Sequence, residues 1–153
     1  MKNLSLFLIL IFFTSCGYEP VYQNQGNISL NINKIEFAGD KYLNRIIERR
    51  INQFPVNNSE NAFNLSIISS LEDKINNKDK KGNPTSYLTS INISLKIYNG
   101  KETFEKVFKE NFIYNHNENI FEQNQYRKNL IQNNANKILN DILKFLIEIS
   151  RKN

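Results

Sequence analysis

Apolar residues along this chain change their spacing several times, and each spacing predicts a secondary-structure element. Between residues 28 and 37 they alternate, with the parity reversing midway, at Ile28, Leu30, Ile32, Ile35 and Phe37. A two-residue period is typical of a half-buried strand, and a change of parity indicates a bulge. The pattern therefore predicts a first strand with a bulge near Asn33 and Lys34.

A helix is predicted over residues 41–54. Gly39 and Asp40 supply a break and an N-cap, and Pro55 ends the run. The apolar positions between them follow a helical period and include Tyr42, Leu43, Ile46, Ile47, Ile51 and Phe54. One face of this helix is therefore expected to pack on a core.

Two further segments return to the two-residue period of a strand. The first runs over 63–75, with apolar residues at Phe63, Leu65, Ile67, Leu71 and Ile75. The second runs over 87–97, with Tyr87, Ile91, Ile93, Leu95 and Ile97. Residues 76–84 between them are polar, charged and rich in turn formers, so we expect an exposed loop there.

Asn99-Gly100 predicts a hairpin with a two-residue turn, because this dipeptide tolerates positive φ at both positions. In that register, the numbers of two residues that lie opposite each other on the two strands add up to 199. The predicted pairs are Leu95 with Phe104, Ile91 with Phe108 and Tyr87 with Phe112. A slip of one residue would place the two apolar sets on opposite faces.

From Ile120 the period becomes helical for about 30 residues, a length of roughly 45 Å. The apolar stripe includes Ile131, Ala135, Ile138, Ile142, Leu146 and Ile149, and it also takes in Arg127. The order of elements is β-α-β-β-β-α. We expect an α+β fold, a four-stranded mixed sheet with two helices packed on one face.

The N-terminus carries a different pattern: Lys2, then about ten apolar residues, then Thr14-Ser15-Cys16. Ten apolar residues are too few for a transmembrane helix, which needs roughly 20. The segment instead has the layout of a secretory signal that is later removed. Cys16 is the only cysteine of the chain, so an internal disulfide is excluded.

The end of this signal resembles the lipobox of bacterial lipoproteins, with Phe13 where leucine is usual. The resemblance implies cleavage after Ser15 and acylation of Cys16, which would anchor the chain in a membrane. The residue after the cysteine is Gly17 rather than aspartate, and in this respect the chain resembles lipoproteins that are sorted to the outer membrane. The alternative is an ordinary secretory signal with Cys16 left as a free thiol. We expect a signal peptide at 1–15, a lipidated tether at 16–27 and a single α+β domain at 28–150.

Removal of residues 1–15 would leave 138 of the 153 residues, enough for one domain with a sizeable core. Only Lys2 is lost from the charged residues, so the mature chain would keep 19 basic and 15 acidic side chains. This mild excess permits contact with phosphates or an anionic lipid surface but is also common in proteins that touch neither. We expect no nucleic-acid partner.

The sequence offers little catalytic chemistry. The single histidine, His116, lies in a polar segment and is expected to be an exposed loop residue, which makes a zinc site improbable. No serine lies in a nucleophile elbow, and no glycine-rich phosphate loop is present. Glu72 and Asp73, near a predicted strand end, are expected to be solvated. We expect no enzyme, no metal and no cofactor.

Two basic groups are candidate binding residues. Arg45 and Arg49 lie one turn apart on the first helix, and Lys78, Lys80 and Lys81 belong to the polar loop. Both groups can be ordinary solvated surface. The alternative is contact with lipid phosphates, in particular those of lipopolysaccharide, through bidentate arginine and point-charge lysine contacts.

The segment Cys16-Gly17-Tyr18-Glu19-Pro20-Val21-Tyr22 is similar to the Cys-Gly-Phe-x-Pro-Leu-Tyr opening of the LptE family of lipopolysaccharide-assembly lipoproteins. Tyr18 and Val21 depart from it conservatively. The resemblance implies a non-enzymatic, periplasm-facing lipoprotein of the outer membrane. Its partner would be the barrel LptD, inside which it would sit as a plug that assists lipopolysaccharide assembly at the cell surface. The alternative is another periplasm-facing lipoprotein, a binding or scaffold module without a barrel partner.

Overall fold

The protein is represented by a computed structural model that describes residues 32–53 and 62–151. The predicted signal peptide, the tether, the first residues of strand 28–37 and the helix end at Phe54 and Pro55 lie outside the described residues. The described elements are β1 (Ile32–Gly39), α2 (Lys41–Ile51), β2 (Phe63–Lys78), β3 (Pro84–Tyr98), β4 (Thr103–Asn115) and α3 (Ile120–Ser150).

The four strands form one sheet in the order β1-β2-β3-β4. β1 is parallel to β2, and the other neighbours are antiparallel, so the sheet is mixed. The predicted fold class and element order are confirmed. The register shifts between Ile32 and Lys34, where the sequence predicts a bulge.

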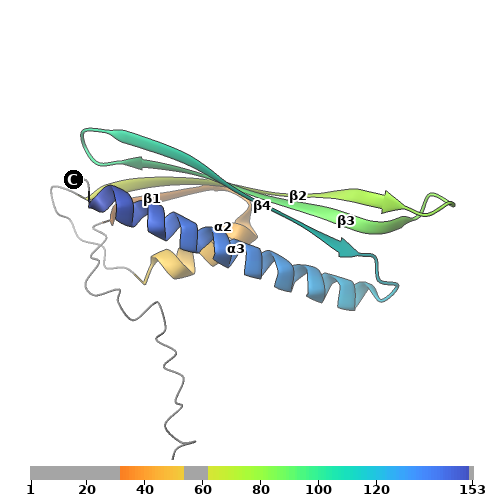
Figure 1. Cartoon of the computed structure of the whole chain (residues 1–153). Helices are drawn as coiled ribbons and strands as arrows, with labels where there is room; N and C mark the ends of the chain where they lie inside the picture. The colour runs from red at the N-terminus through yellow and green to blue at the C-terminus, as the bar shows by residue number, and fades with distance from the viewer. Residues whose placement is uncertain (1–31, 54–61, 152–153) are drawn as a thin grey trace, which may run out of the picture.

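Both helices lie on the same face of the sheet, with α3 running along most of its length (Figure 1). The core lies between the layers. It is formed by alternate residues of the strands and by the apolar stripes of the helices, including Leu65, Ile67, Ile93, Leu95, Ile47, Ile138, Ile142 and Leu146. Burial of these side chains is the main contribution to the stability of the fold. The opposite face of the sheet is covered by no described helix or strand.

The junction between β1 and α2 is tightly fixed against β2. Asp40 caps α2, because its carboxylate accepts hydrogen bonds from the backbone N–H groups of Tyr42 and Leu43 at 2.9 and 2.8 Å. Its own backbone N–H donates to the carbonyl of Ser69 at 3.0 Å. The predicted N-cap is confirmed, while α2 ends at Ile51, three residues before the predicted end.

The predicted register of the β3–β4 hairpin is wrong by two residues. The observed opposite pairs are Ile97 with Phe104, Ile93 with Phe108 and Tyr87 with Tyr114. The connection has four residues because the Asn99 side chain accepts hydrogen bonds from the N–H groups of Lys101 and Glu102, at 3.0 and 2.7 Å. A shift by two keeps every residue on its predicted face, so the apolar pattern is satisfied in either register.

The β2–β3 hairpin extends beyond the helix α2. β2 continues to Lys78 and β3 begins at Pro84, so the connecting loop is Asp79–Asn83 rather than the predicted 76–84. α2 begins beside Ser69, in the middle of β2, and runs away from this loop (Figure 1). The hairpin tip therefore projects from one end of the molecule.

Candidate functional site

The tip of the β2–β3 hairpin carries three of the predicted basic residues on a loop held by one carboxylate. Asp79 accepts hydrogen bonds from the backbone N–H groups of Lys81 and Asn83, both at 2.8 Å, and from the Asn83 side-chain amide at 3.1 Å. Its backbone N–H donates to the Asn83 carbonyl at 2.9 Å. These bonds fix the loop and leave Lys78, Lys80 and Lys81 exposed.

The hydrogen bonds from the backbone and side chain of Asn83 lower the pKa of Asp79, because they stabilise its charged form. Asp79 thus stays ionised beside the lysines over the physiological pH range. Among the described residues, no carboxylate forms an ion pair with Lys78, Lys80 or Lys81. The tip therefore presents three lysines around one carboxylate, an excess of two positive charges, in a geometry set by the loop backbone.

The structure does not bring Arg45 and Arg49 to this tip. Both are exposed on α2, and Arg45 Nε donates to the Lys41 carbonyl at 3.3 Å. Lys78 lies nine residue steps along β2 from Ser69, which is beside the start of α2, a distance of roughly 30 Å at 3.3 Å per residue. The two predicted basic groups cannot contact the same phosphate cluster.

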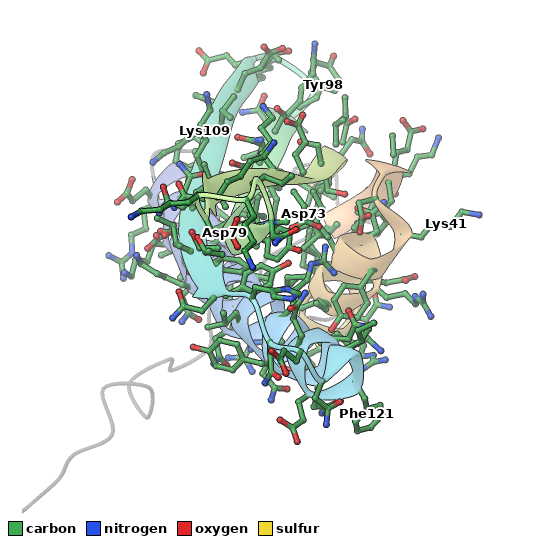
Figure 2. The ribbon with its side chains drawn as sticks, turned by 90° about the vertical axis from the view of Figure 1, so that its right-hand side faces the viewer. Lys41, Asp73, Asp79, Tyr98, Lys109 and Phe121 are labelled. Atoms are coloured by element: carbon green, nitrogen blue, oxygen red, sulfur yellow. The ribbon has the colours of Figure 1, made fainter. Side chains whose placement is uncertain are left out.

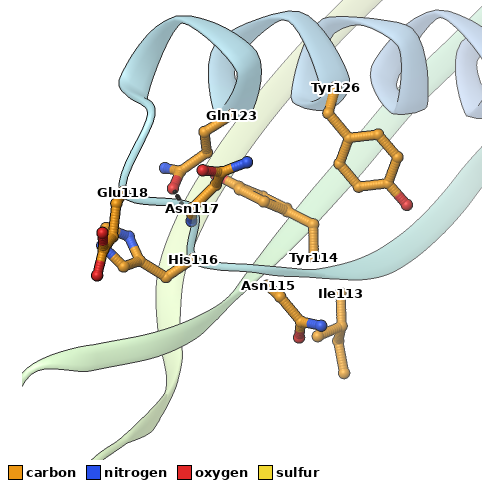
Figure 3. A pocket seen from close by; sticks show the side chains of 8 residues that line it. All are labelled: Ile113, Tyr114, Asn115, His116, Asn117, Glu118, Gln123 and Tyr126. Atoms are coloured by element: carbon orange, nitrogen blue, oxygen red, sulfur yellow. Dashed lines mark hydrogen bonds between the residues drawn. The ribbon is translucent and has the colours of Figure 1, made fainter.

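A cleft of about 630 Å³ lies near the same end of the molecule, between the end of β4 and the start of α3 (Figure 3). Tyr114, His116, Gln123 and Tyr126 are among its lining residues. The segment between β4 and α3 is held by the N–H of Asn117, which donates to Gln123 Oε1 at 2.8 Å. The cleft is open and polar, with aromatic walls.

His116 is exposed, as predicted, and its backbone N–H donates to the Thr85 carbonyl at 2.9 Å. Its ring centroid lies 6.1 Å from that of Tyr87. Within residues 32–53 and 62–151, no three His, Cys, Asp or Glu side chains are grouped so that they could hold a metal ion.

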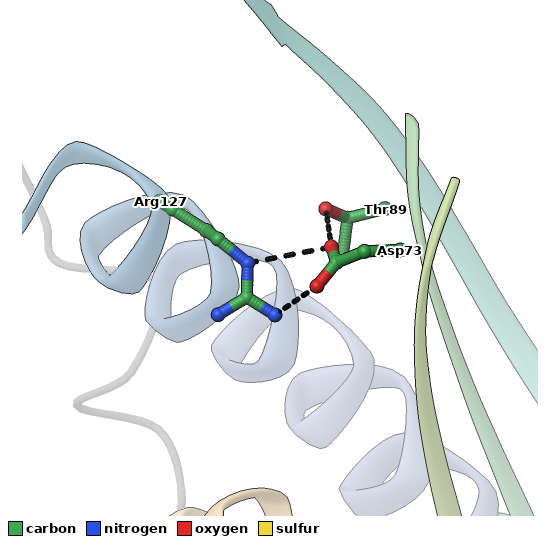
Figure 4. Close-up of polar contacts among 3 residues, drawn as sticks. All are labelled: Asp73, Thr89 and Arg127. Atoms are coloured by element: carbon green, nitrogen blue, oxygen red, sulfur yellow. Dashed lines mark hydrogen bonds and ion pairs between the residues drawn. The ribbon is translucent and has the colours of Figure 1, made fainter. Parts of the chain in front are cut away.

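A polar cluster under the first half of α3 was missed by the sequence interpretation. Asp73 accepts hydrogen bonds from Thr89 Oγ1 at 2.5 Å and Arg127 Nε at 3.3 Å, and it forms an ion pair with the Arg127 guanidinium (Figure 4). Glu72 and Asp73 are exposed, as expected, but both lie inside β2 rather than at its end. What the sequence interpretation missed is that Asp73 is paired with α3. The signal in the sequence is Arg127 itself, a charged residue on an apolar helix stripe.

This cluster links α3 to the central strands β2 and β3. It lies beyond the end of the apolar core between the helix and the sheet. Burial raises the pKa of the nearby Tyr114 phenol, and the Asp73 carboxylate adds to the rise. The Tyr114 ring stacks on Tyr87 at 5.3 Å between centroids. These contacts position the β4–α3 corner and hence the cleft.

Ser15 and Cys16, the predicted cleavage and lipidation positions, lie outside the described residues. Over the part of the chain that the structure describes, neither helix is both long and apolar enough to cross a membrane.

The sequence matches no family model and has no significant match among curated proteins. Solved structures do match. Rare lipoprotein B from Shewanella oneidensis aligns with a TM-score of 0.62 and 16% identity, over 78% of this chain and 98% of that one. Lipoprotein B from Nitrosomonas europaea aligns with a TM-score of 0.55 and 13% identity, over 81% of this chain and 91% of that one.

These comparisons define the class of fold. The chain shares the β-α-β-β-β-α architecture of lipoprotein structures of the rare lipoprotein B type, which is the LptE-like fold. At 16% and 13% identity the likeness concerns the fold alone.

Proposed function

We propose that this protein is an outer-membrane lipoprotein of the LptE type, which sits as a plug in the barrel LptD and assists lipopolysaccharide assembly at the cell surface. Acylation of Cys16 would anchor it, facing the periplasm. The observation that carries the proposal is the Cys16–Tyr22 motif on a chain with an LptE-like fold. Neither feature alone would suffice, because short motifs recur and one fold hosts many functions.

A plug role agrees with the properties of the described domain. It is a two-layer body whose exposed surface is largely polar, with separate exposed apolar side chains such as Ile113 and Phe121, and the lumen of an outer-membrane barrel is polar as well. Such surfaces can form a hydrogen-bonded interface with bridging water. Lys78, Lys80 and Lys81 at the hairpin tip are proposed to contact lipopolysaccharide phosphates as point charges that outnumber the one carboxylate beside them.

Co-purification from detergent-solubilised outer membranes tests the proposal. The affinity-tagged full-length chain is expected to recover a large outer-membrane barrel in a stoichiometric complex. Mass spectrometry is expected to find acyl chains on Cys16 as the new N-terminus, and a Cys16→Ala variant should remain unprocessed.

Two outcomes would contradict parts of the proposal in different ways. Recovery of the acylated chain without a barrel, in a detergent that preserves such complexes, would leave the scaffold or binding lipoprotein as the function. An unmodified thiol at Cys16 would remove the lipoprotein assignment.

A further inference from the structure

The sheet face opposite the helices differs in composition from the rest of the protein. Side chains alternate between faces along each strand, so the neighbours of the buried core positions point away from the helices. Small polar residues dominate the centre of this open face: Ser66, Ser70, Ser90, Asn92, Ser94 and Asn111. The side-chain amide of Asn92 on β3 donates to Ser70 Oγ on the neighbouring strand β2 at 3.3 Å.

Charges on the open face are neutralised within the face. Lys96 on β3 pairs with Glu105 on β4 at 2.9 Å. The other two ion pairs join residues two apart on one strand: Lys34 with Glu36 at 2.7 Å, and Lys74 with Glu72 at 3.5 Å. Lys109 is the remaining charge on this face (Figure 2). The face therefore has little net attraction for an anionic lipid surface, in contrast to the hairpin tip.

Exposed apolar side chains interrupt this polar surface in more than one place: Ile113 opposite Leu88, Tyr98 at the end of β3, and a group around Ser94. Ile68 on β2 and Val107 on β4 are each opposite Ser94 of the central strand β3. They are 55% and 54% exposed, and they line a hollow of about 320 Å³ together with Ser94, Lys96 and Glu105. Because the Ser94 side chain is small, the Ile68 and Val107 side chains stand higher on either side of it and leave a shallow hollow between them. We call this feature the Ser94 socket.

The composition of this face indicates the chemistry of a partner that could pack against it. A surface of small side chains on a sheet allows a second sheet to approach to about 10 Å. Paired charges favour a neutral, hydrogen-bonding wall, since an unpaired charge opposite them would disturb the pairs. An apolar side chain from that wall would fill the socket and act as the anchor of an otherwise wet interface.

We propose that the open sheet face, with the Ser94 socket at its centre, is the surface that packs against the inner wall of the barrel. This inference rests on the proposed function and adds to it the face of contact. The wall of a barrel is itself a sheet with a polar inner face, so the contact is sheet on sheet.

The test compares full-length variants in the co-purification experiment. Ser94→Arg fills the socket with a long charged side chain, and Ile68→Ser combined with Val107→Ser removes the aliphatic side chains on either side of it without adding bulk. Both are expected to lower barrel recovery by at least about fivefold. The matched control is Asn133→Arg on the exposed side of α3, which should leave recovery unchanged. Thermal denaturation of each variant checks that the fold is kept.

The outcomes separate the two proposals. Failure of the wild-type chain to recover a barrel would contradict the function itself. Normal recovery with both socket variants, or an equal loss with Asn133→Arg, would overturn the inference and leave the function in place. Light scattering could instead show that the wild-type chain is a dimer and that Ser94→Arg is a monomer. That result would assign the Ser94 socket to a second copy of this chain and would also overturn the inference.

Discussion

Gly39 lies where the backbone of β2 leaves no room for a side chain. It has a φ of +90°, and an added Cβ would lie 1.9 Å from the backbone carbonyl oxygen of Ser69. The same carbonyl receives the N–H of Asp40, so the strand cannot shift without loss of that bond. The close approach of β1 to β2 at this point requires glycine.

We predict that Gly39→Ala lowers the free energy of unfolding by about 3 kcal/mol or more, since a backbone clash is added to the strain of positive φ. Gly82→Ala is the matched control, because Gly82 has a φ of +89° and open space around it. It should cost only the strain, about 1 kcal/mol. Urea denaturation measures both, and equal losses would contradict the close-approach argument.

Asp79 makes the tip loop sensitive to acid. Its pKa is lowered in the folded loop by the Asn83 hydrogen bonds, so its contribution to loop stability is present above the ordinary value of 3.8 and is lost as the pH falls through the folded-state pKa. We predict that the backbone amide signals of Lys81 and Asn83 change together below about pH 4 in NMR titration. Asp79→Asn should abolish this step; a step that persists would assign it to another group.

At the scale of elements, the β3–β4 hairpin shows how a side chain in a turn sets the register of two long strands. Asn99 closes a four-residue connection, and every pair along β4 follows from it. Opposite residues lie close enough for a disulfide, whereas diagonal neighbours lie too far apart.

We therefore predict that a Ser90→Cys, Asn111→Cys pair oxidises to a disulfide in a Cys16→Ser background, because these residues are opposite each other. The Ser90→Cys, Lys109→Cys pair, which the two-residue turn would place opposite, should remain reduced. Non-reducing electrophoresis and mass spectrometry distinguish the two. If only the Ser90→Cys, Lys109→Cys pair formed a disulfide, the register with the two-residue turn would be the correct one.

At the scale of the whole molecule, the fold separates charge by position. The Lys78–Lys81 tip carries an excess of positive charge and projects from one end, while the charges of the open sheet face, apart from Lys109, form ion pairs within that face. Arg45 and Arg49 lie on α2, far from the tip. Each surface therefore suits a different partner chemistry.

We predict that Lys80→Glu with Lys81→Glu weakens lipopolysaccharide binding, and that the loss shrinks as salt is raised, because exposed charges are screened over about 10 Å at 0.1 M. Arg45→Glu with Arg49→Glu, a change of the same charge, should have little effect. Binding of labelled lipopolysaccharide at two salt concentrations measures both. Equal weakening by the two variants would point to a general charge effect.

Much of the architecture could be predicted because periodicity alone carries it. The two-residue and helical periods located each described strand and helix, and the parity change located the bulge at Asn33. The register of β4 could not be predicted from periodicity, since a two-residue slip leaves every apolar residue on its face. The Asp73–Arg127 pair was missed because its members are 54 positions apart.

The amino-acid sequence by itself determined the element order, the helix cap at Asp40, the exposed position of His116 and the class of fold, because these depend on local spacing and local hydrogen bonding. The tertiary structure alone decided the strand order, the distance between the two basic groups, the counterion of Arg127 and the socket around Ser94. Each of these depends on which distant segments become neighbours, and that is fixed only when the helices and the sheet bury their apolar faces together.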